Sequence, residues 1–253
     1  MARSNEVKAR LRGGHAVVGS FCNLPSPDVV ELLGWAGFDF VIIDAEHGPQ
    51  GIETVANMVR GAEASETTPL VRVAINEPQN ILRHLDTGAQ GLQMPMVNTQ
   101  EDAERAVAAA LYPPQGRRGL AGVRAGGFGV RESVPDYAAT ANDEMLVIVQ
   151  IETVEALGNL DSILSVPGID IVFFGATDLS SSMGIPGKTR DDRVVNAIAD
   201  AGKAVMNAGL VAGTIVGTPE QAVEWQGRGF RYIATNFAGL AGRAARAFIE
   251  GAR

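Results

Sequence analysis

Residues 38–50 read FDFVIIDAEHGPQ, and the interpretation of the fold starts from this stretch. Residues 40–44 are apolar enough for a strand that is buried on both faces, as the strands of a parallel sheet are. The stretch ends in a polar cluster of Asp44, Glu46 and His47, which folding alone does not require. It therefore predicts a buried strand with chemically functional side chains at its carboxyl end.

Seven further runs of strand type alternate with helical patterns along the 253 residues. The eight predicted strands are residues 17–21, 40–44, 70–73, 91–95, 146–151, 171–174, 211–214 and 232–235. Strands that are separated by helices form right-handed crossovers and a parallel sheet. Because the chain holds eight such units, we predict an α/β fold, one closed (β/α)8 TIM barrel that forms a single domain over residues 1–253.

Local helix signals support this alternation. Ser26 and Thr218, each followed by a proline, are typical of helix starts. Thr99 and Asp102 have the spacing of a capping box. Residues 113–142 are the exception, because they form an irregular stretch that is too long for an ordinary connection. We predict that this stretch is functional or contacts another subunit.

Composition and charge exclude several classes of protein. Hydrophobic residues make up 46% of the chain and charged residues 20%, as in a globular protein with a large core. The net charge is -8 and no basic tract occurs, which argues against a nucleic-acid partner. No apolar run has the length of a membrane span or a signal peptide, so we expect no membrane partner. Cys22 is the only cysteine, which fits a reducing, cytoplasmic location.

Two neighbouring strand ends carry carboxylates that suit a metal ion. If residues 146–151 form a regular strand, Ile148, Gln150 and Glu152 share one face. Asp178 follows the next strand after a glycine turn, which can bring it beside Glu152. Carboxylates without a nearby thiolate favour Mg²⁺ or Mn²⁺. The alternative is that both acids cap helices or accept hydrogen bonds from backbone amides.

Arg72 and His47 each allow a functional and a structural interpretation. Arg72 lies in an apolar strand, where it can pair with Asp44 or Glu46, or present its planar guanidinium to a substrate carboxylate. His47 lies three residues after Asp44, and a carboxylate can fix the imidazole tautomer and leave the other nitrogen as a base. A polar surface histidine is the alternative.

The positions of the lysines disfavour one class of reaction mechanism. Lys8, Lys188 and Lys203 are the only three in the chain, and none lies on a predicted strand. A Schiff-base mechanism needs a lysine buried at the site, so the sequence disfavours it. Carbanion chemistry in this chain would depend instead on a metal ion as the electron sink.

Six segments together resemble the HpcH/HpaI aldolase family of metal-dependent, class II pyruvate aldolases. They are DAEHG, LVRVAINEP, LDTGAQGLQMPMVNTQEDAERAV, YPPQGRRG, VQIET and GIDIVFFGATDLSSSMG, in this order. Family members include 4-hydroxy-2-oxoheptanedioate aldolases and 2-keto-3-deoxy sugar-acid aldolases. The resemblance runs from about Gly19 to Arg246, and the order of the six segments makes it specific.

The resemblance implies a catalytic set. Glu152 and Asp178 match the family's metal ligands. Arg72 matches the arginine that binds pyruvate and its developing enolate. His47, oriented by Asp44, matches the catalytic base.

Other matched positions concern substrate binding and assembly. Gln150 matches a glutamine near the pyruvate, and the backbone of Gly175, Ala176 and Thr177 is expected to approach the pyruvate carboxylate. Asp86 matches a catalytic acid that family hexamers deliver to a neighbouring subunit's site. The segment GATD departs from the family's Gly-Pro-x-Asp, which affects the carboxylate pocket and keeps the metal ligand. The segments RAGGFG and ATNFAG also differ from the family pattern, so the identity of the aldehyde is left open.

The implied activity is that of a carbon–carbon lyase. A 4-hydroxy-2-oxoacid would be cleaved reversibly to pyruvate, or a related 2-oxoacid, and an aldehyde through an enolate held by Mg²⁺ or Mn²⁺, with Co²⁺ or Zn²⁺ as further options. The alternatives are oxaloacetate decarboxylation or another metal-dependent 2-oxoacid lyase reaction, cleavage of a CoA ester, and a binding barrel without activity. The resemblance also implies a homo-hexamer, a trimer of dimers that swaps the C-terminal helix at residues 237–251.

Overall fold

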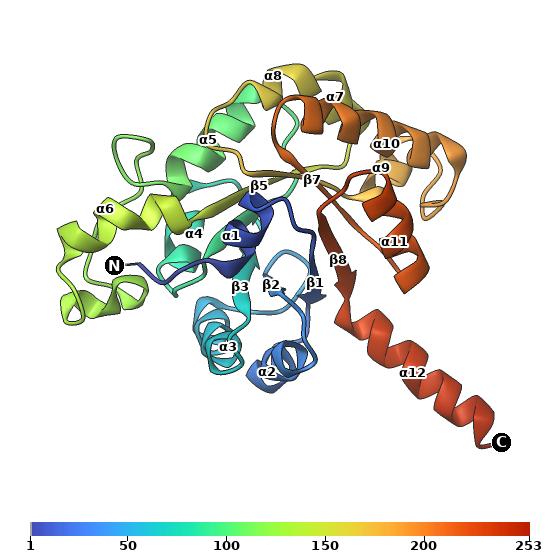
Figure 1. The fold of residues 1–253 in the computed structure, drawn as a ribbon, viewed down its shortest axis with the longest axis horizontal. Helices are drawn as coiled ribbons and strands as arrows, with labels where there is room; N and C mark the ends of the chain where they lie inside the picture. The colour runs from blue at the N-terminus through green and yellow to red at the C-terminus, as the bar shows by residue number, and fades with distance from the viewer. Residues whose placement is uncertain (1) are drawn as a thin grey trace.

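The computed structural model describes residues 2–253, and eight parallel strands close into one barrel in sequence order (Figure 1). The strands are β1 (Val17–Cys22), β2 (Phe40–Asp44), β3 (Thr68–Arg72), β4 (Gly91–Met94), β5 (Leu146–Ile151), β6 (Ile171–Phe174), β7 (Val211–Ile215) and β8 (Tyr232–Asn236). Each strand pairs with the next, and β8 pairs with β1. The predicted (β/α)8 barrel is confirmed.

The strand bounds agree closely with the sequence-based prediction. Strands β2, β5 and β6 have the predicted limits. The largest difference is in β3, which begins two residues earlier than expected because Thr68 and Pro69 pair with Phe40 and Val41 of β2. Strand β3 ends at Arg72, so the arginine is the last residue of its strand.

Helices connect the strands and surround the barrel (Figure 1). The helical segments are α1 (Glu6–Arg12), α2 (Pro27–Trp35), α3 (Ile52–Ala64), α4 (Pro78–Leu85), α5 (Gln100–Ala110), the 3₁₀ segment η1 (Arg124–Gly129), α6 (Val134–Glu144), α7 (Val154–Gly158), α8 (Leu160–Leu164), α9 (Ala176–Ser182), α10 (Asp192–Asn207), α11 (Pro219–Gly227) and α12 (Phe237–Gly251). The predicted starts are confirmed, since the hydroxyls of Ser26, Thr99 and Thr218 each accept a backbone N–H of the first turn. Asp102 completes the capping box of α5.

The prediction of an irregular stretch at residues 113–142 is wrong in its second half. Helix α6 begins there, with Ser133 as its cap and a proline in its first turn. Only Tyr137 and Ala141 of this helix are buried, so its apolar periodicity is faint in the sequence. The preceding segment η1 is irregular as expected, and Gly127 and Phe128 both have positive φ angles in it.

The core has two layers, because alternate residues of each strand face opposite sides of the sheet. The outer layer fills the space between the strands and the helices. The inner layer fills the barrel with residues such as Phe40, Ile42 and Phe173, and Val7 and Leu11 of α1 join this layer. The same alternation directs both the apolar Phe40 and Ile42 and the polar residues at the ends of the strands into the barrel.

The amino ends of the strands are closed by paired charges. The Lys8 ammonium lies 3.0 Å from an Asp170 carboxylate oxygen and donates to the Met145 carbonyl. Lys188 and Lys203 are exposed. The expectation that no lysine lies on a barrel strand is confirmed, and Lys8 is buried at the end of the barrel where the strands begin.

Helix α12 projects away from the barrel (Figure 1), and none of its residues is buried. Phe248 and Ile249 near its end are 75% and 48% exposed. This apolar exposure is costly for a helix in water. No helix in residues 2–253 combines the length and apolar character that crossing a membrane requires.

Candidate active site

A cavity of about 220 Å³ opens at the carboxyl ends of the strands. It gathers most of the predicted site residues from strands and loops that are far apart in the sequence. Its walls are Phe21, His47, Arg72, Gln150, Phe173, Gly175, Ala176, Thr177, Asp178, Ile215 and Asn236. Active sites of barrels of this kind lie at this end.

Arg72 is the buried cation of the cavity, and its side chain is 9% exposed. Its Nε and Nη2 atoms donate to the two carboxylate oxygens of Asp44 at 2.9 and 2.7 Å. Its Nη1 atom lies 3.1 Å from Glu46 Oε2, and its guanidinium lies over the Phe21 ring at 4.7 Å. The predicted pairing of Arg72 with acids is confirmed for both partners. It follows from the register of β2 and β3, in which Asp44 lies opposite Arg72.

Asp44 contacts His47 through the main chain. Its Oδ1 atom accepts the backbone N–H groups of Glu46 and His47, both at 3.2 Å, and so shapes the turn after β2. The His47 imidazole is 61% exposed, and its Nε2 atom lies 3.9 Å from Glu46 Oε2. The carboxylate that approaches the ring therefore belongs to Glu46, which the sequence analysis considered only as a partner of Arg72.

Glu152 is held at the centre of the site and is 2% exposed. Its Oε1 atom accepts the Met96 N–H at 2.8 Å, and its Oε2 atom accepts the Gln150 amide. A Cβ atom on Gly175 would lie 2.6 Å from Glu152 Oε2, so the carboxylate fits only beside glycine. Burial raises the pKa of Glu152 to about 7, with Asp178 among the negative charges that add to the shift.

Glu46 adds to this excess of negative charge. Burial raises its pKa, Arg72 and His47 partly offset the shift, and Asp178 raises it further. Its Oε2 atom is buried and has no aligned hydrogen-bond donor, although Arg72 is close enough for an ion pair. The charge of Asp178 therefore opposes the ionisation of both Glu46 and Glu152, and the charge of Glu46 adds to the effect on Glu152.

The donor set fits a hard divalent cation. A cation beside Glu152 and Asp178 would offset the burial, and the smaller repulsion from Asp178, that raise the pKa of Glu152. Within the described residues, no group of three or more His, Cys, Asp or Glu side chains is arranged to hold a metal. Two protein carboxylates leave further positions to water and substrate oxygens, as Mg²⁺ and Mn²⁺ accept.

Gly175, Ala176 and Thr177 lie in the cavity wall as predicted. Gly175 precedes α9, and Ala176 is the first residue of that helix. Where the family pattern has proline, Ala176 adds a backbone N–H group that proline would lack. The GATD segment therefore brings one more donor to the wall next to Asp178.

Asp86 lies away from this cavity. It follows the end of α4 and precedes β4, at the end of the barrel where the strands begin. Its Oδ1 atom accepts a 3.0 Å hydrogen bond from Arg118, whose side chain is fully buried over the Tyr112 ring. A single chain therefore does not bring Asp86 to its own candidate site.

The sequence analysis missed two polar side chains inside the barrel. Gln93 of β4 is fully buried, lies opposite Arg72 in register, and donates to Gln150 at 2.8 Å. Tyr232 of β8 is also fully buried. A glutamine between Leu92 and Met94 was the visible signal, because a barrel interior is ordinarily apolar.

A second cavity of about 320 Å³ adjoins the first. The two cavities share Ala176, Thr177, Ile215 and Asn236. The second cavity is lined by polar and apolar groups and includes two arginines, Arg190 and Arg243. Arg190 Nη1 lies 3.2 Å from a Glu224 carboxylate oxygen.

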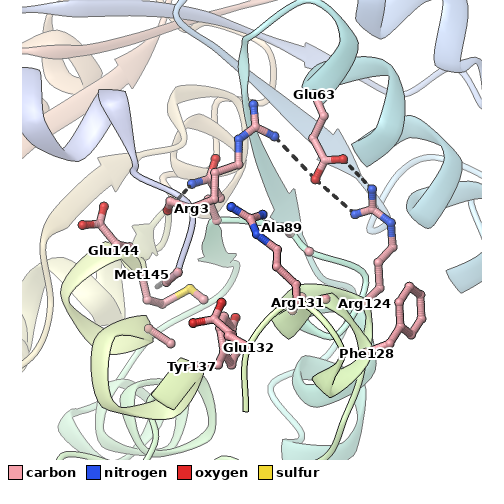
Figure 2. A pocket seen from close by; sticks show the side chains of 16 residues that line it. Arg3, Glu63, Ala89, Arg124, Phe128, Arg131, Glu132, Tyr137, Glu144 and Met145 are labelled. Carbon is pink, nitrogen blue, oxygen red and sulfur yellow. Dashed lines mark hydrogen bonds and ion pairs between the residues drawn. The ribbon is translucent and has the colours of Figure 1, made fainter. Parts of the chain in front are cut away.

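A further cavity of about 240 Å³ lies at the opposite end of the barrel (Figure 2). Glu63 in its wall is paired with two arginines, since it accepts from Arg124 and lies 3.4 Å from Arg3. Arg124 also donates to the Thr87 carbonyl at 2.8 Å, which ties η1 to the barrel. None of the predicted catalytic or metal-binding side chains lines it.

Comparisons with known proteins agree on one family. The model of the family described as HpcH/HpaI aldolase/citrate lyase matches residues 18–243. A pyruvate aldolase of Rhizobium etli is 42% identical over 218 residues, which are 86% of this chain and 84% of the relative. A 4-hydroxy-2-oxo-heptane-1,7-dioate aldolase of Escherichia coli is 38% identical over 230 residues, 91% and 87% of the two chains. A crystal structure of a family protein from Burkholderia cenocepacia has a TM-score of 0.93 and 36% identity, and the match covers 99% of this chain and 100% of that one.

Proposed function

Because this chain belongs to the HpcH/HpaI aldolase/citrate lyase family and is a 4-hydroxy-2-oxoacid aldolase, a carbon–carbon lyase, we propose that a divalent metal ion serves its reaction and that pyruvate is the 2-oxoacid it releases. The names of the relatives do not favour oxaloacetate decarboxylation as its main activity. The observation that carries the metal proposal is the concentration of carboxylates at this end of the barrel. Asp178 lines the cavity, its charge acts on Glu46 and Glu152, and Arg72 is the only arginine or lysine among the residues that line the cavity.

Glu152 and Asp178 are the proposed metal ligands, and Mg²⁺ or Mn²⁺ is the proposed ion, with Co²⁺ or Zn²⁺ as substitutes. Bound there, the ion would supply positive charge to the oxygen atoms of the 2-oxoacid as the enolate develops. Hydrogen bonds from Met96 and Gln150 fix both oxygens of Glu152. Asp178 is exposed to the cavity, where it remains open to a ligand.

Arg72 is proposed to stabilise the charge that develops on the 2-oxoacid. Asp44 holds the guanidinium by two hydrogen bonds and Phe21 supports its face, so it is oriented before substrate arrives. A preorganised cation in a site that excludes water stabilises a developing negative charge more than a mobile one does. The Gly175–Thr177 backbone and Gln150 line the same cavity and are proposed to bind the pyruvate half.

His47 is proposed as the base that removes the proton from the 4-hydroxyl group. Its imidazole lies in the cavity wall and is open to solvent, so it can pass the proton to water. Loss of that proton breaks the bond between C3 and C4, which yields the aldehyde and leaves the electron pair on the pyruvate enolate. Asp44 contributes by fixing the turn that carries His47.

The adjoining cavity supports an aldehyde half that carries its own carboxylate. The name of the Escherichia coli relative denotes a substrate with two carboxylates. In this chain, Arg190 and Arg243 line the cavity next to the proposed pyruvate site. Replacement of Arg243 by alanine should raise the KM of an acidic aldehyde about tenfold in the condensation direction and leave that of a neutral aldehyde unchanged.

We also propose a homo-hexamer built as a trimer of dimers. The support is α12, which projects from the barrel with Phe248 and Ile249 exposed and would find its apolar partner on a second copy. Asp86 would act at a neighbour's site, since it lies at the far end of its own barrel. Light scattering at micromolar concentration tests this, and an active monomer would contradict both parts.

The proposed location is the cytoplasm. Cys22 is the only cysteine, and it is buried with a pKa that burial raises to about 11, as suits an unreactive thiol in a reducing compartment. The proposed partners are small-molecule acids and aldehydes together with further copies of this chain. Fractionation of the native host cell tests the location.

One assay tests the proposed chemistry. Pyruvate release is measured across a panel of 4-hydroxy-2-oxoacids, with and without EDTA, and oxaloacetate is included as the rival substrate. We expect metal-dependent release from at least one hydroxy-oxoacid and restoration of activity by Mg²⁺ or Mn²⁺. Full activity in metal-free protein, or a lysine adduct trapped by borohydride, would contradict the proposal.

A further inference from the structure

A line of buried polar side chains crosses the inside of the barrel from β8 to β5. The Tyr232 hydroxyl donates to Gln93 Oε1 at 3.5 Å, the longest link, and Gln93 Nε2 donates to Gln150 Oε1 at 2.8 Å. Gln150 Nε2 donates in turn to the Glu152 carboxylate. Tyr232 and Gln93 are fully buried, and Gln150 and Glu152 are 2% exposed. We call these four side chains the amide relay.

The direction of the amide relay is set at its Glu152 end. An ionised carboxylate only accepts hydrogen bonds, so Gln150 must turn its NH₂ group toward Glu152 and its oxygen toward Gln93. Gln93 then donates from its own NH₂ group and turns its oxygen toward Tyr232, whose hydroxyl supplies the donor. If either amide were flipped, two oxygens or two NH₂ groups would face each other away from water. The relay is therefore consistent in one orientation, with its donors pointing toward Glu152.

Aromatic packing fixes the outer end of the amide relay. The Tyr232 ring stacks on Phe40 with centroids 4.3 Å apart and planes 10° apart, and it meets Phe173 edge-on at 6.0 Å. Barrel interiors are ordinarily filled by branched aliphatic side chains, so closure of this barrel does not require glutamines at these positions. Buried amides that the fold does not need point to a role at the site next to them.

We propose that Gln93, held by Tyr232, is a positioning residue that keeps the Gln150 amide donating to Glu152 and so keeps the Glu152 carboxylate aimed at the divalent cation. The inference rests on the proposed function, in which Glu152 is one of the two metal ligands. The Met96 N–H already fixes one oxygen of Glu152, so the relay controls the other. Partners that orient metal ligands typically change metal affinity about 10–100-fold when they are lost.

The test measures the Mn²⁺ dissociation constant of the EDTA-treated full-length protein by titration calorimetry. Gln93→Met keeps the length of the side chain and removes its hydrogen bonds, and it should raise the dissociation constant about 10–100-fold. Gln93→Glu should raise it further, because an acceptor at position 93 would draw the Gln150 NH₂ group away from Glu152. Tyr232→Phe keeps the stacked ring and should produce a smaller rise than Gln93→Met.

Gln90→Leu is the matched control. Gln90 is a buried glutamine just before β4, and its Nε2 atom donates to the carbonyl oxygens of Arg3 and Ser4 at 3.0 and 2.9 Å. Its loss should lower the melting temperature and leave the Mn²⁺ dissociation constant unchanged. This separates the loss of a buried amide as such from the loss of the relay.

The outcomes separate a failure of the amide relay from a failure of the proposed metal site. Parental Mn²⁺ affinity in folded Gln93→Met and Gln93→Glu would overturn the relay and leave the metal proposal standing. If the unaltered chain is active and binds neither Mn²⁺ nor Mg²⁺, the metal proposal fails and the relay fails with it. If the Gln93 variants do not fold, Tyr232→Phe decides, and an unchanged dissociation constant in that variant overturns the relay.

Discussion

The two ends of the barrel treat charge in opposite ways. Where the strands begin, Glu63 pairs with Arg3 and Arg124 (Figure 2), and Lys8 pairs with Asp170. Where the strands end, Arg72 is shared between Asp44 and Glu46, while Glu152 and Asp178 have no ion-pair partner among the described residues. Among the described residues, Glu63 and Asp170 at one end therefore have cationic partners, whereas Glu152 and Asp178 at the other end do not.

This difference separates stability from function. Paired charges stabilise a fold modestly and do not call for a ligand. Unpaired buried carboxylates destabilise a fold, so a chain keeps them where a cation or a reaction uses them. The same kind of substitution should therefore have opposite consequences at the two ends, and the predictions below test that contrast.

The largest effect is expected for Glu152→Gln. The variant loses one of the two proposed metal ligands, and metal ions contribute several kcal/mol to such transition states. We expect kcat/KM for aldol cleavage to fall about a thousandfold or more, since about 1.4 kcal/mol corresponds to a factor of ten. Steady-state pyruvate release measures this, and turnover within tenfold of the parental value would remove Glu152 from the metal site.

The same variant should be more stable than the parent when both are free of metal. Folding raises the pKa of Glu152 from 4.5 to about 7, so the folded chain binds this proton more tightly than the unfolded chain does. By linkage, this tighter proton binding stabilises the metal-free parent at low pH. The contribution falls as the pH rises through this range and is lost above the folded pKa. We expect Glu152→Gln to be about 1–3 kcal/mol more stable near pH 8, as urea unfolding can measure. An equal or lower stability would contradict the charge excess.

Arg72→Ala should affect both activity and stability. Loss of a preorganised cation costs about 2–4 kcal/mol at the transition state, so kcat/KM should fall about a hundredfold or more. Asp44 and Glu46 would lose their buried partner, which should lower the free energy of unfolding by about 3–5 kcal/mol. Arg72→Lys is the control, and it should rescue poorly because a point charge cannot hold both oxygens of Asp44. Near-parental activity of Arg72→Ala would contradict the proposed role.

His47→Ala should reduce activity and leave stability unchanged. General-base catalysis contributes about 10²–10⁴-fold, and we expect a loss near the lower limit because the imidazole is open to solvent and water can replace it. Pyruvate proton exchange should fall less than aldol cleavage, since it does not involve the 4-hydroxyl group. An equal loss in both reactions, or a lower melting temperature, would assign His47 a structural role instead.

The smallest effect is expected for Glu63→Gln, the same substitution made at the other end of the barrel. It weakens the pairing of Glu63 with Arg3 and Arg124, so the free energy of unfolding should fall by about 1 kcal/mol. The kcat/KM for aldol cleavage should be unchanged, because Glu63 lies at the end opposite the candidate site. A gain in stability, as expected for Glu152→Gln, would break the contrast between the two ends.

The sequence by itself determined the elements of the fold and one face of the site. Strand β5 illustrates why, since the alternation of Ile148, Gln150 and Glu152 is a property of neighbouring residues. The caps at Ser26, Thr99 and Thr218 are local in the same sense. The implied roles of the site residues came from the resemblance to a family and stay predictions.

Only the tertiary structure decided which polar groups meet. The two hydrogen bonds between Arg72 and Asp44 depend on the register of β2 and β3, and the contact between Gln93 and Gln150 depends on the register of the neighbouring strands β4 and β5. The position of Asp86 at the far end depends on the direction of α4. Alternation along a strand is set by local backbone geometry, whereas contacts between strands depend on register and barrel closure, which involve residues far apart in the chain.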